Sequence, residues 1–178
     1  MIMTKTKKIA LMAILTAIAL IIFIIEAQIP LPVPVPGVKL GLANAVTLFA
    51  LFYGGKREPV TYLTTANVFT ILLCRIILGA VFTGRPIAFI YSIAGGLLAL
   101  TVQVIAKRFV TGKQIWVCGA AGAVFHNIGQ ILVAVFITGT LAIAAYLPVL
   151  IIAGVFTGVL TGLIAQLTLE RLHNIKLK

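Results

Sequence analysis

The sequence contains no aspartate, and glutamate occurs only at Glu26, Glu58 and Glu170, against fourteen lysines and arginines. Hard cations such as Mg²⁺ prefer several carboxylate oxygens, so an aspartate-rich magnesium site cannot be built here. There is no GxxxxGK[ST] segment either, which excludes hydrolysis of ATP in the P-loop manner. No nucleophile–base pair or metal-ligand cluster is recognisable. We therefore expect no catalysis by this chain alone, and no metal or cofactor.

Charged residues of either sign are scarce, because 10% of the 178 residues are charged and 62% are hydrophobic. A soluble domain has about 25% charged and about 45–50% apolar residues. One soluble core could not bury so much apolar surface. The composition predicts an all-α integral membrane protein whose main solvent is lipid.

Cysteine occurs only at Cys74 and Cys118, inside predicted spans and without metal-ligand or disulfide-framework spacing. We interpret both as small apolar packing residues. The first apolar run follows Lys5, Lys7 and Lys8, as in a signal peptide. It extends over about twenty residues, however, and no small-residue cleavage site follows. We expect a retained transmembrane helix.

Glycine, proline and charge clusters divide the apolar sequence into spans. A helix that crosses the hydrocarbon core needs about twenty residues. We predict one domain, residues 1–178, whose six spans lie near residues 8–29, 40–55, 59–83, 87–106, 114–138 and 141–169. The second span is short, and the sixth is long enough to tilt or to extend beyond the bilayer.

The basic residues predict an orientation. Six spans put both termini on one side, where eleven of the fourteen lysines and arginines lie; Lys39 and Arg85 lie on the other side, and Arg75 lies within a span. Cytoplasmic loops carry the excess of lysine and arginine, so both termini are predicted to be cytoplasmic. This distribution accounts for the net charge of +11 without a nucleic-acid partner.

Small residues recur at four-residue spacing in two spans, at Ala13 and Ala17 in the first and at Gly154, Gly158 and Gly162 in the sixth. Such faces let membrane helices approach closely. Packing inside the bundle is the default interpretation of both faces.

Polar side chains recur at one depth in five predicted spans. Ionisable groups inside a membrane face the bundle interior or a cavity and are functional candidates by default. Given a rise of about 1.5 Å per residue, the middle-to-outer level contains Glu26, Gln28, Asn44, Arg75, Tyr91, His126, Asn127 and Gln130. His126 and Gln130 share a helix face, with Asn127 adjacent. The pattern predicts a wet cavity open to the external side, although any single residue could instead tie two helices together.

Arg75 cannot neutralise itself by losing a proton, so it needs Glu26, a cage of carbonyls or an anionic ligand. Arg75 and Lys39, with His126 as a further candidate, outnumber Glu26 and favour a ligand with a carboxylate or phosphate. The proline-rich loop 30–41 is stiff and extended. We expect it to roof the cavity with Lys39 reaching in; a plain rigid connector is the alternative.

Four segments carry a resemblance: PGVKLGLAN (36–44), LLCRIILGAVFTGRP (72–86), YSIAGGLLAL (91–100) and GAVFHNIGQ (122–130). Over nearly the whole chain they resemble the heptaprenyl diphosphate synthase component I family, also called Gx transporter. The family name implies an accessory subunit of a prenyl-diphosphate synthase. The family is also similar to the substrate-binding S-components of energy-coupling factor (ECF) transporters, six-helix proteins of the bacterial plasma membrane with both termini inside.

The resemblance to S-components implies roles for particular residues. Ala13 and Ala17 would correspond to the AxxxA motif of helix one, which docks on the transmembrane T-component. Loop 30–41 would lie over the ligand, and the residues that bind it would be Asn44, Arg75, His126, Asn127 and Gln130. Transport would require a separate T-component and two ATP-binding subunits.

Two functions from different classes therefore compete. The leading hypothesis is a substrate-binding subunit of an ECF-type importer for an anionic, vitamin-like or prenyl/quinone-related small molecule. Its predicted site comprises Glu26, Lys39, Asn44, Arg75, Tyr91, His126, Asn127 and Gln130. The alternative is a non-catalytic membrane accessory subunit that recruits a soluble synthase through its basic cytoplasmic loops. A stand-alone facilitator is a third possibility.

Overall fold

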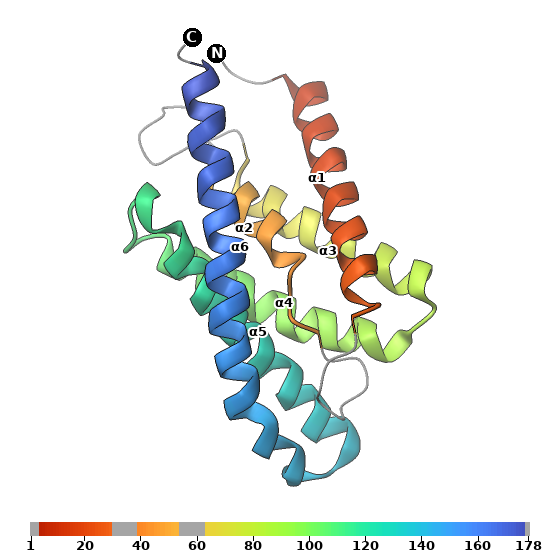
Figure 1. The fold of residues 1–178 in the computed structure, drawn as a ribbon. Helices are drawn as coiled ribbons and strands as arrows, with labels where there is room; N and C mark the ends of the chain where they lie inside the picture. Colours follow the sequence, from red (N-terminus) through yellow and green to blue (C-terminus); the bar gives the residue numbers. More distant parts are fainter. Residues whose placement is uncertain (1–3, 30–38, 54–62, 177–178) are drawn as a thin grey trace.

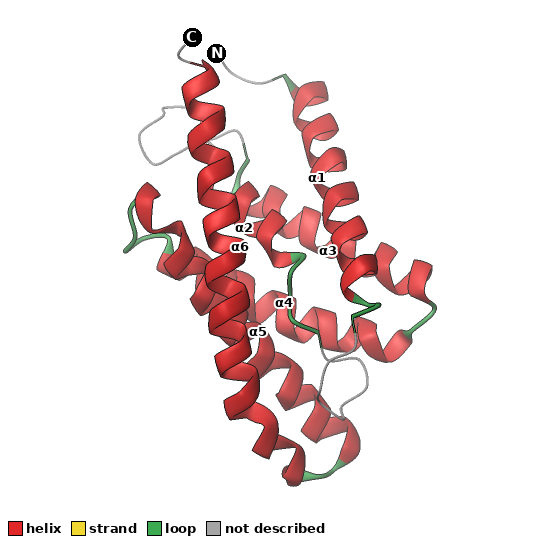
Figure 2. Cartoon of the chain, in the orientation of Figure 1, coloured by secondary structure: helices red, strands yellow, loops and turns green. Residues whose placement is uncertain are grey.

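The computed structural model describes residues 4–29, 39–53 and 63–176. The α-helices in these residues are α1 (Lys5–Glu26), α2 (Asn44–Phe52), α3 (Thr65–Thr83), α4 (Pro86–Ala106), α5 (Ile115–Thr138) and α6 (Leu147–Lys176), as Figure 1 shows. Short 3-10 helices, η1 (Gly112–Gln114) and η2 (Leu141–Tyr146), precede α5 and α6. The described residues contain no strand (Figure 2), which confirms the predicted all-α class.

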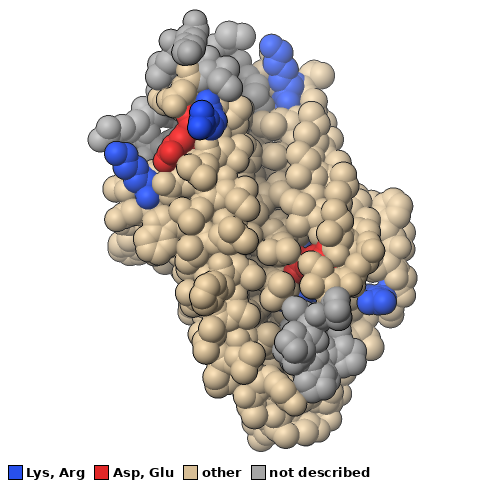
Figure 3. All heavy atoms as spheres, viewed as in Figure 1, with Lys and Arg blue, Asp and Glu red and all other residues tan. Residues whose placement is uncertain are grey.

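Five helical segments are long and apolar enough to cross a membrane: Lys5–Glu26, Thr65–Thr83, Pro86–Ala106, Gly112–Thr138 and Leu141–Asn174. They coincide with five of the six predicted spans. In the face drawn in Figure 3, charged side chains are few, and several gather at the end where α1 begins and α6 finishes. These features support the prediction of a membrane protein.

The predicted second span differs from what the structure contains. Within residues 40–53, the described part of this span, the helix is α2, with nine residues and a length of about 14 Å. This is about half of what a crossing requires. Seven of its nine residues are buried, and α2 contacts α1, α3, α4, α5 and α6. A bundle of six crossing helices with cytoplasmic termini stays a prediction.

Local sequence determines several helix ends. Thr64 and Asn67 form a capping box at the start of α3, because the side chain of each accepts the backbone N–H of the other. Pro86 occupies the first turn of α4, where its missing N–H has no cost. Gly84 and Gly139 end α3 and α5 with φ angles of 61° and 65°, a left-handed conformation that glycine adopts without strain.

The helices form two groups around α2. In one group α5 packs along α4 and α6, and in the other α1 lies against α3. The N-terminal end of α1 and the C-terminal end of α6 lie at the same end of the molecule (Figure 1). Residues 39–43, which precede α2, meet α5 inside the bundle, where the candidate site is found.

The glycines of the sixth predicted span pack inside the molecule. A Cβ on Gly158 would lie 2.5 Å from the carbonyl oxygen of Gly119, and a Cβ on Gly162 would lie 2.5 Å from the Cα of Trp116. The backbones of α5 and α6 are therefore in direct contact, as the internal-packing interpretation expected. Ala13 and Ala17 are different, because both are exposed on α1.

Gly158→Ala should lower the free energy of unfolding by about 1–3 kcal/mol, because the added methyl group meets backbone that cannot move aside. The measurement is the thermal unfolding midpoint of the purified protein in detergent. Gly112→Ala is the matched control, because a Cβ there has nothing within 4 Å. Equal midpoints for the two variants would contradict the proposed backbone contact.

Candidate functional site

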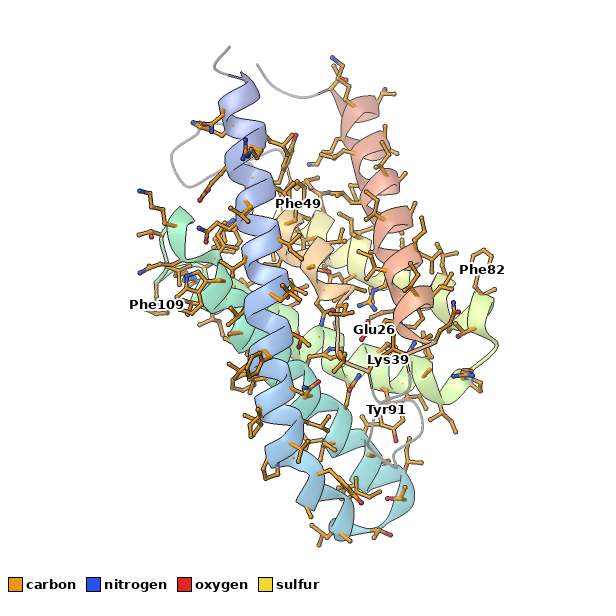
Figure 4. All side chains as sticks on the ribbon, in the orientation of Figure 1. Glu26, Lys39, Phe49, Phe82, Tyr91 and Phe109 are labelled. Carbon is orange, nitrogen blue, oxygen red and sulfur yellow. The ribbon has the colours of Figure 1, made fainter. Side chains whose placement is uncertain are left out.

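Polar residues from four helices and one connecting segment meet at the C-terminal end of α1. Glu26 ends α1, Asn44 begins α2, Arg75 lies on α3, and His126 and Gln130 lie on α5. The segment that precedes α2, residues 39–43, passes among them and contributes Lys39. These six side chains form the polar cluster, and all of them are buried. In Figure 4 the labelled side chains of Glu26 and Lys39 lie near each other below the end of α1.

Segment 39–43 is held from two sides. The Gly41 N–H donates to Oε1 of Glu26 on α1, and the Lys39 N–H donates to Oε1 of Gln130 on α5, at 3.1 Å. Gly41 has a φ of 81°, and a Cβ there would lie 2.8 Å from Cδ2 of His126. Only glycine satisfies both the left-handed backbone and this close approach. The segment therefore links α1 to α5.

The hydrogen bonds of Gln130 assign the protonation of His126. Because Oε1 of Gln130 accepts from Lys39, its Nε2 faces His126, and the two Nε2 atoms are 3.0 Å apart. An amide nitrogen can only donate, so Nε2 of His126 accepts and the imidazole is neutral, with its proton on Nδ1. That Nδ1 lies against Gly95 of α4, where a Cβ would be 2.7 Å away.

The two cations of the site share an aromatic ring. Nζ of Lys39 is 3.3 Å from the centroid of Phe23, and Cζ of Arg75 is 5.4 Å from it. A cation over an aromatic face gains electrostatic attraction, and more when water is excluded. Nη2 of Arg75 also donates to Oδ1 of Asn44, at 3.3 Å. Both cations lie within electrostatic range of Glu26.

Several nitrogen atoms of the site are buried and make no hydrogen bond to the described residues: Lys39 Nζ, Arg75 Nε and Asn44 Nδ2. A buried donor without an acceptor costs about 1–3 kcal/mol, and more when it is charged. Native proteins leave few such groups unsatisfied. All three unsatisfied atoms are donors, so the chemistry that complements them is an acceptor-rich, anionic group.

Two predicted site residues face elsewhere. Asn127 is fully buried, and its Nδ2 donates to the carbonyl of Leu150 on α6, at 2.6 Å. It ties two helices together, which is the alternative given above for such a residue. Tyr91 is buried in an apolar cluster with Ile131, Ala134 and Leu150. Gln28 is exposed, and its side chain bonds the carbonyl of Ile24.

Part of the predicted roof lies outside the described residues, namely 30–38. Residues 39–41 are described: Lys39 is buried, and Gly41 packs against the ring of His126. Two surface grooves, of about 540 and about 350 Å³, run along α4–α5 and α3–α4. Neither is lined by a residue of the polar cluster. The open external cavity therefore stays a prediction.

Sequence reasoning did not identify Phe23, Gly41 and Gly95 as part of the site. Phe23 lies three residues before Glu26 and so on the same face of α1, a spacing that could have identified it. Gly41 and Gly95 carry no side chain, and their importance comes from the His126 ring that packs on them. That contact joins distant parts of the chain and leaves no local signal.

Comparison with known proteins gives one result. The model of the family described as heptaprenyl diphosphate synthase component I matches residues 15–168. The chain belongs to this family. No curated protein and no solved structure was found to match. The match confirms the resemblance identified from the sequence, and its range includes the whole polar cluster and Ala17 but not Ala13.

Members of the heptaprenyl diphosphate synthase component I family are described, by that name, as one component of a synthase. The name implies one or more partner subunits. It does not define what the buried cluster of this chain binds. In the described residues, no three His, Cys, Asp or Glu side chains are grouped so that they could hold a metal ion.

The charge of Lys39 should make the stability of the folded protein depend on pH in a predictable way. Burial lowers the pKa of Lys39 from 10.5 to about 8, although Glu26 acts in the opposite direction. Between these values the unfolded chain binds more protons than the folded one, so stability rises with pH. Wild type should therefore gain stability relative to Lys39→Met from about pH 8 to about pH 10.5, and the difference should be constant below pH 8.

Unfolding midpoints of both proteins, measured in detergent across this range, provide the test. If the midpoints of wild type and Lys39→Met change in parallel from pH 7 upward, the Lys39 ammonium is solvated. The site would then contain one buried cation, Arg75, and not two.

Proposed function

We propose that this chain is a membrane-embedded substrate-binding subunit, similar to an S-component, of an ECF-type importer. The observation that carries the proposal is the group of buried, unsatisfied nitrogen donors around Arg75 and Lys39. A site that only stabilised the fold would pair these donors internally. An anionic small molecule, vitamin-like or prenyl/quinone-related, would supply the missing acceptors.

The residues of the site divide into two roles in this proposal. Arg75 and Lys39 neutralise the charge of the ligand, and Nδ2 of Asn44 donates a directional hydrogen bond. Gln130 and His126 hold segment 39–43 in place, through the Lys39 N–H and the packing against Gly41. Asn127 and Tyr91 do not contact the ligand in this proposal; they hold α5 against α6 and α4.

The partner surface in this proposal is the outward face of α1. The inward face packs through Leu15, Ala19 and Phe23, which leaves Ala13 and Ala17 exposed. A small-xxx-small face that is not used inside the chain is available for close contact with another membrane helix. A T-component with its ATP-binding subunits would occupy it and supply the energy for transport.

The test is mass spectrometry of the small molecules that the gently purified protein retains. Wild type should carry an anionic metabolite that Arg75→Ala loses, because the guanidinium cannot be replaced by water in a buried site. Arg171→Ala, which removes an exposed arginine at the far end of α6, should retain it. The same small molecules in wild type and Arg75→Ala would contradict the proposed site.

The family name favours a second candidate, a non-catalytic accessory subunit of a polyprenyl diphosphate synthase. Its docking surface would be the turn between α4 and α5, where Arg108 and Lys113 are exposed and Phe109 is 81% exposed. Lys107 is a poor probe of this surface, since its Nζ donates to the carbonyl of Leu51.

Under this second function, Arg108→Glu combined with Lys113→Glu should abolish copurification of a soluble prenyl synthase. Wild type should retain the synthase in a pull-down from solubilised membranes. The Arg75→Ala variant is the control, because it leaves the α4–α5 turn intact. Absence of any synthase from the wild-type sample would exclude this candidate.

A further inference from the structure

The charge balance of the polar cluster limits the ligand that it can take. We propose that Glu26 stays in the site beside the ligand and restricts the bound anionic group to a single negative charge, such as a carboxylate or a phosphodiester. A phosphate monoester or a diphosphate would then be a poor ligand. This inference deepens the proposed function and rests on it.

Glu26 does not take the place that a ligand would occupy. Its carboxylate accepts the Gly41 N–H and also interacts with the backbone N–H of Leu42. If it left, the start of segment 39–43 would lose its acceptors on α1. Lys39 Nζ and Arg75 Nε also remain unsatisfied in its presence, so Glu26 does not supply the acceptors that these cations lack. The ligand is an addition to Glu26 and does not replace it.

The ionised groups then leave one positive charge to be matched. Arg75 and Lys39 are cations, Glu26 is an anion, and His126 is neutral because its Nε2 accepts from Gln130. The carboxylate of Glu26 accepts the Gly41 N–H, a contact that favours its ionised form. An unmatched charge of either sign strongly destabilises a buried site. A monoanion balances the cluster, and a dianion would leave a negative excess.

Glu26→Gln tests this balance with little change of shape. The amide oxygen can still accept the Gly41 N–H, while the negative charge is removed. The site then carries two positive charges and should prefer a dianion. Glu170→Gln is the matched control, because it makes the same change at an exposed position on α6, where Glu170 bonds Gln166.

The experiment uses acetate as the monoanion and sulfate as the dianion, at constant ionic strength, with the full-length protein in detergent. Apparent dissociation constants come from the rise of the unfolding midpoint with anion concentration. Arg75→Gln supplies the baseline for non-specific salt effects. Above that baseline wild type and Glu170→Gln should prefer acetate, and Glu26→Gln should shift the preference toward sulfate by about tenfold or more.

Two further variants test the same charge balance, and one of them leaves Glu26 unchanged. The double variant Glu26→Gln, Lys39→Met restores one net positive charge and should restore the preference for acetate. Lys39→Met alone leaves no net charge, and neither anion should then raise its midpoint above the baseline.

The failures of the two proposals can be distinguished. If the anions stabilise wild type above the Arg75→Gln baseline but Glu26→Gln keeps the same acetate-to-sulfate ratio, the charge-setting role of Glu26 is wrong and the anion site stands. If wild type and Arg75→Gln respond alike to both anions, there is no anion site, and the proposed function fails with it.

Discussion

Arg75 carries a charge that it cannot lose, in a bundle whose surroundings are lipid. Arg75 is 3% exposed, so water contributes little to the stabilisation of its charge and neighbouring groups must do so. Phe23 contributes an aromatic face, Asn44 a carbonyl oxygen and Glu26 an opposite charge. Phe23 and Glu26 lie on α1, and Asn44 begins α2. The positions of α1, α2 and α3 relative to one another are therefore tied to one side chain on α3.

Segment 39–43 extends the same dependence to the other half of the molecule. Its backbone is bound by Glu26 on one side and by Gln130 on the other. Gln130 in turn fixes the tautomer of His126, and the imidazole packs on Gly41 and Gly95. Polar contacts thus run from α1 to α5, and the packing of the His126 ring on Gly95 extends the connection to α4. In the proposed function, the groups that fix one arrangement of the helices are the same groups that bind the anion.

The sequence alone predicted the long helices well, because apolar runs of about twenty residues have one physical interpretation in a membrane protein. It failed for α2. An apolar run bounded by glycines looks the same whether it crosses lipid or is surrounded by other helices, and only the tertiary contacts of α2 decide this. Composition therefore predicts the surroundings of a helix less well than its existence.

The same limit applies to the site. A common depth was enough to place Glu26, Asn44 and Arg75 near one another, since all three must avoid lipid. Depth does not define direction around a helix axis. Asn127 follows His126 by one residue and so points about 100° away, toward α6, where Leu150 accepts its amide. Tyr91 has the right depth but faces an apolar cluster.

The position of Glu26 at the end of α1 has a mechanical consequence. Helix α1 has 22 residues and is about 33 Å long; it packs mainly against α3, with α2 as its other main neighbour. Such a helix behaves as a stiff rod that is pinned at one end, by the hydrogen bond of Glu26 to segment 39–43. A small tilt at the pinned end moves the opposite end by a larger distance. Ala13 and Ala17 lie on the same helix. A tilt of α1 about its Glu26 end would therefore displace their exposed surface, although neither residue contacts the buried site.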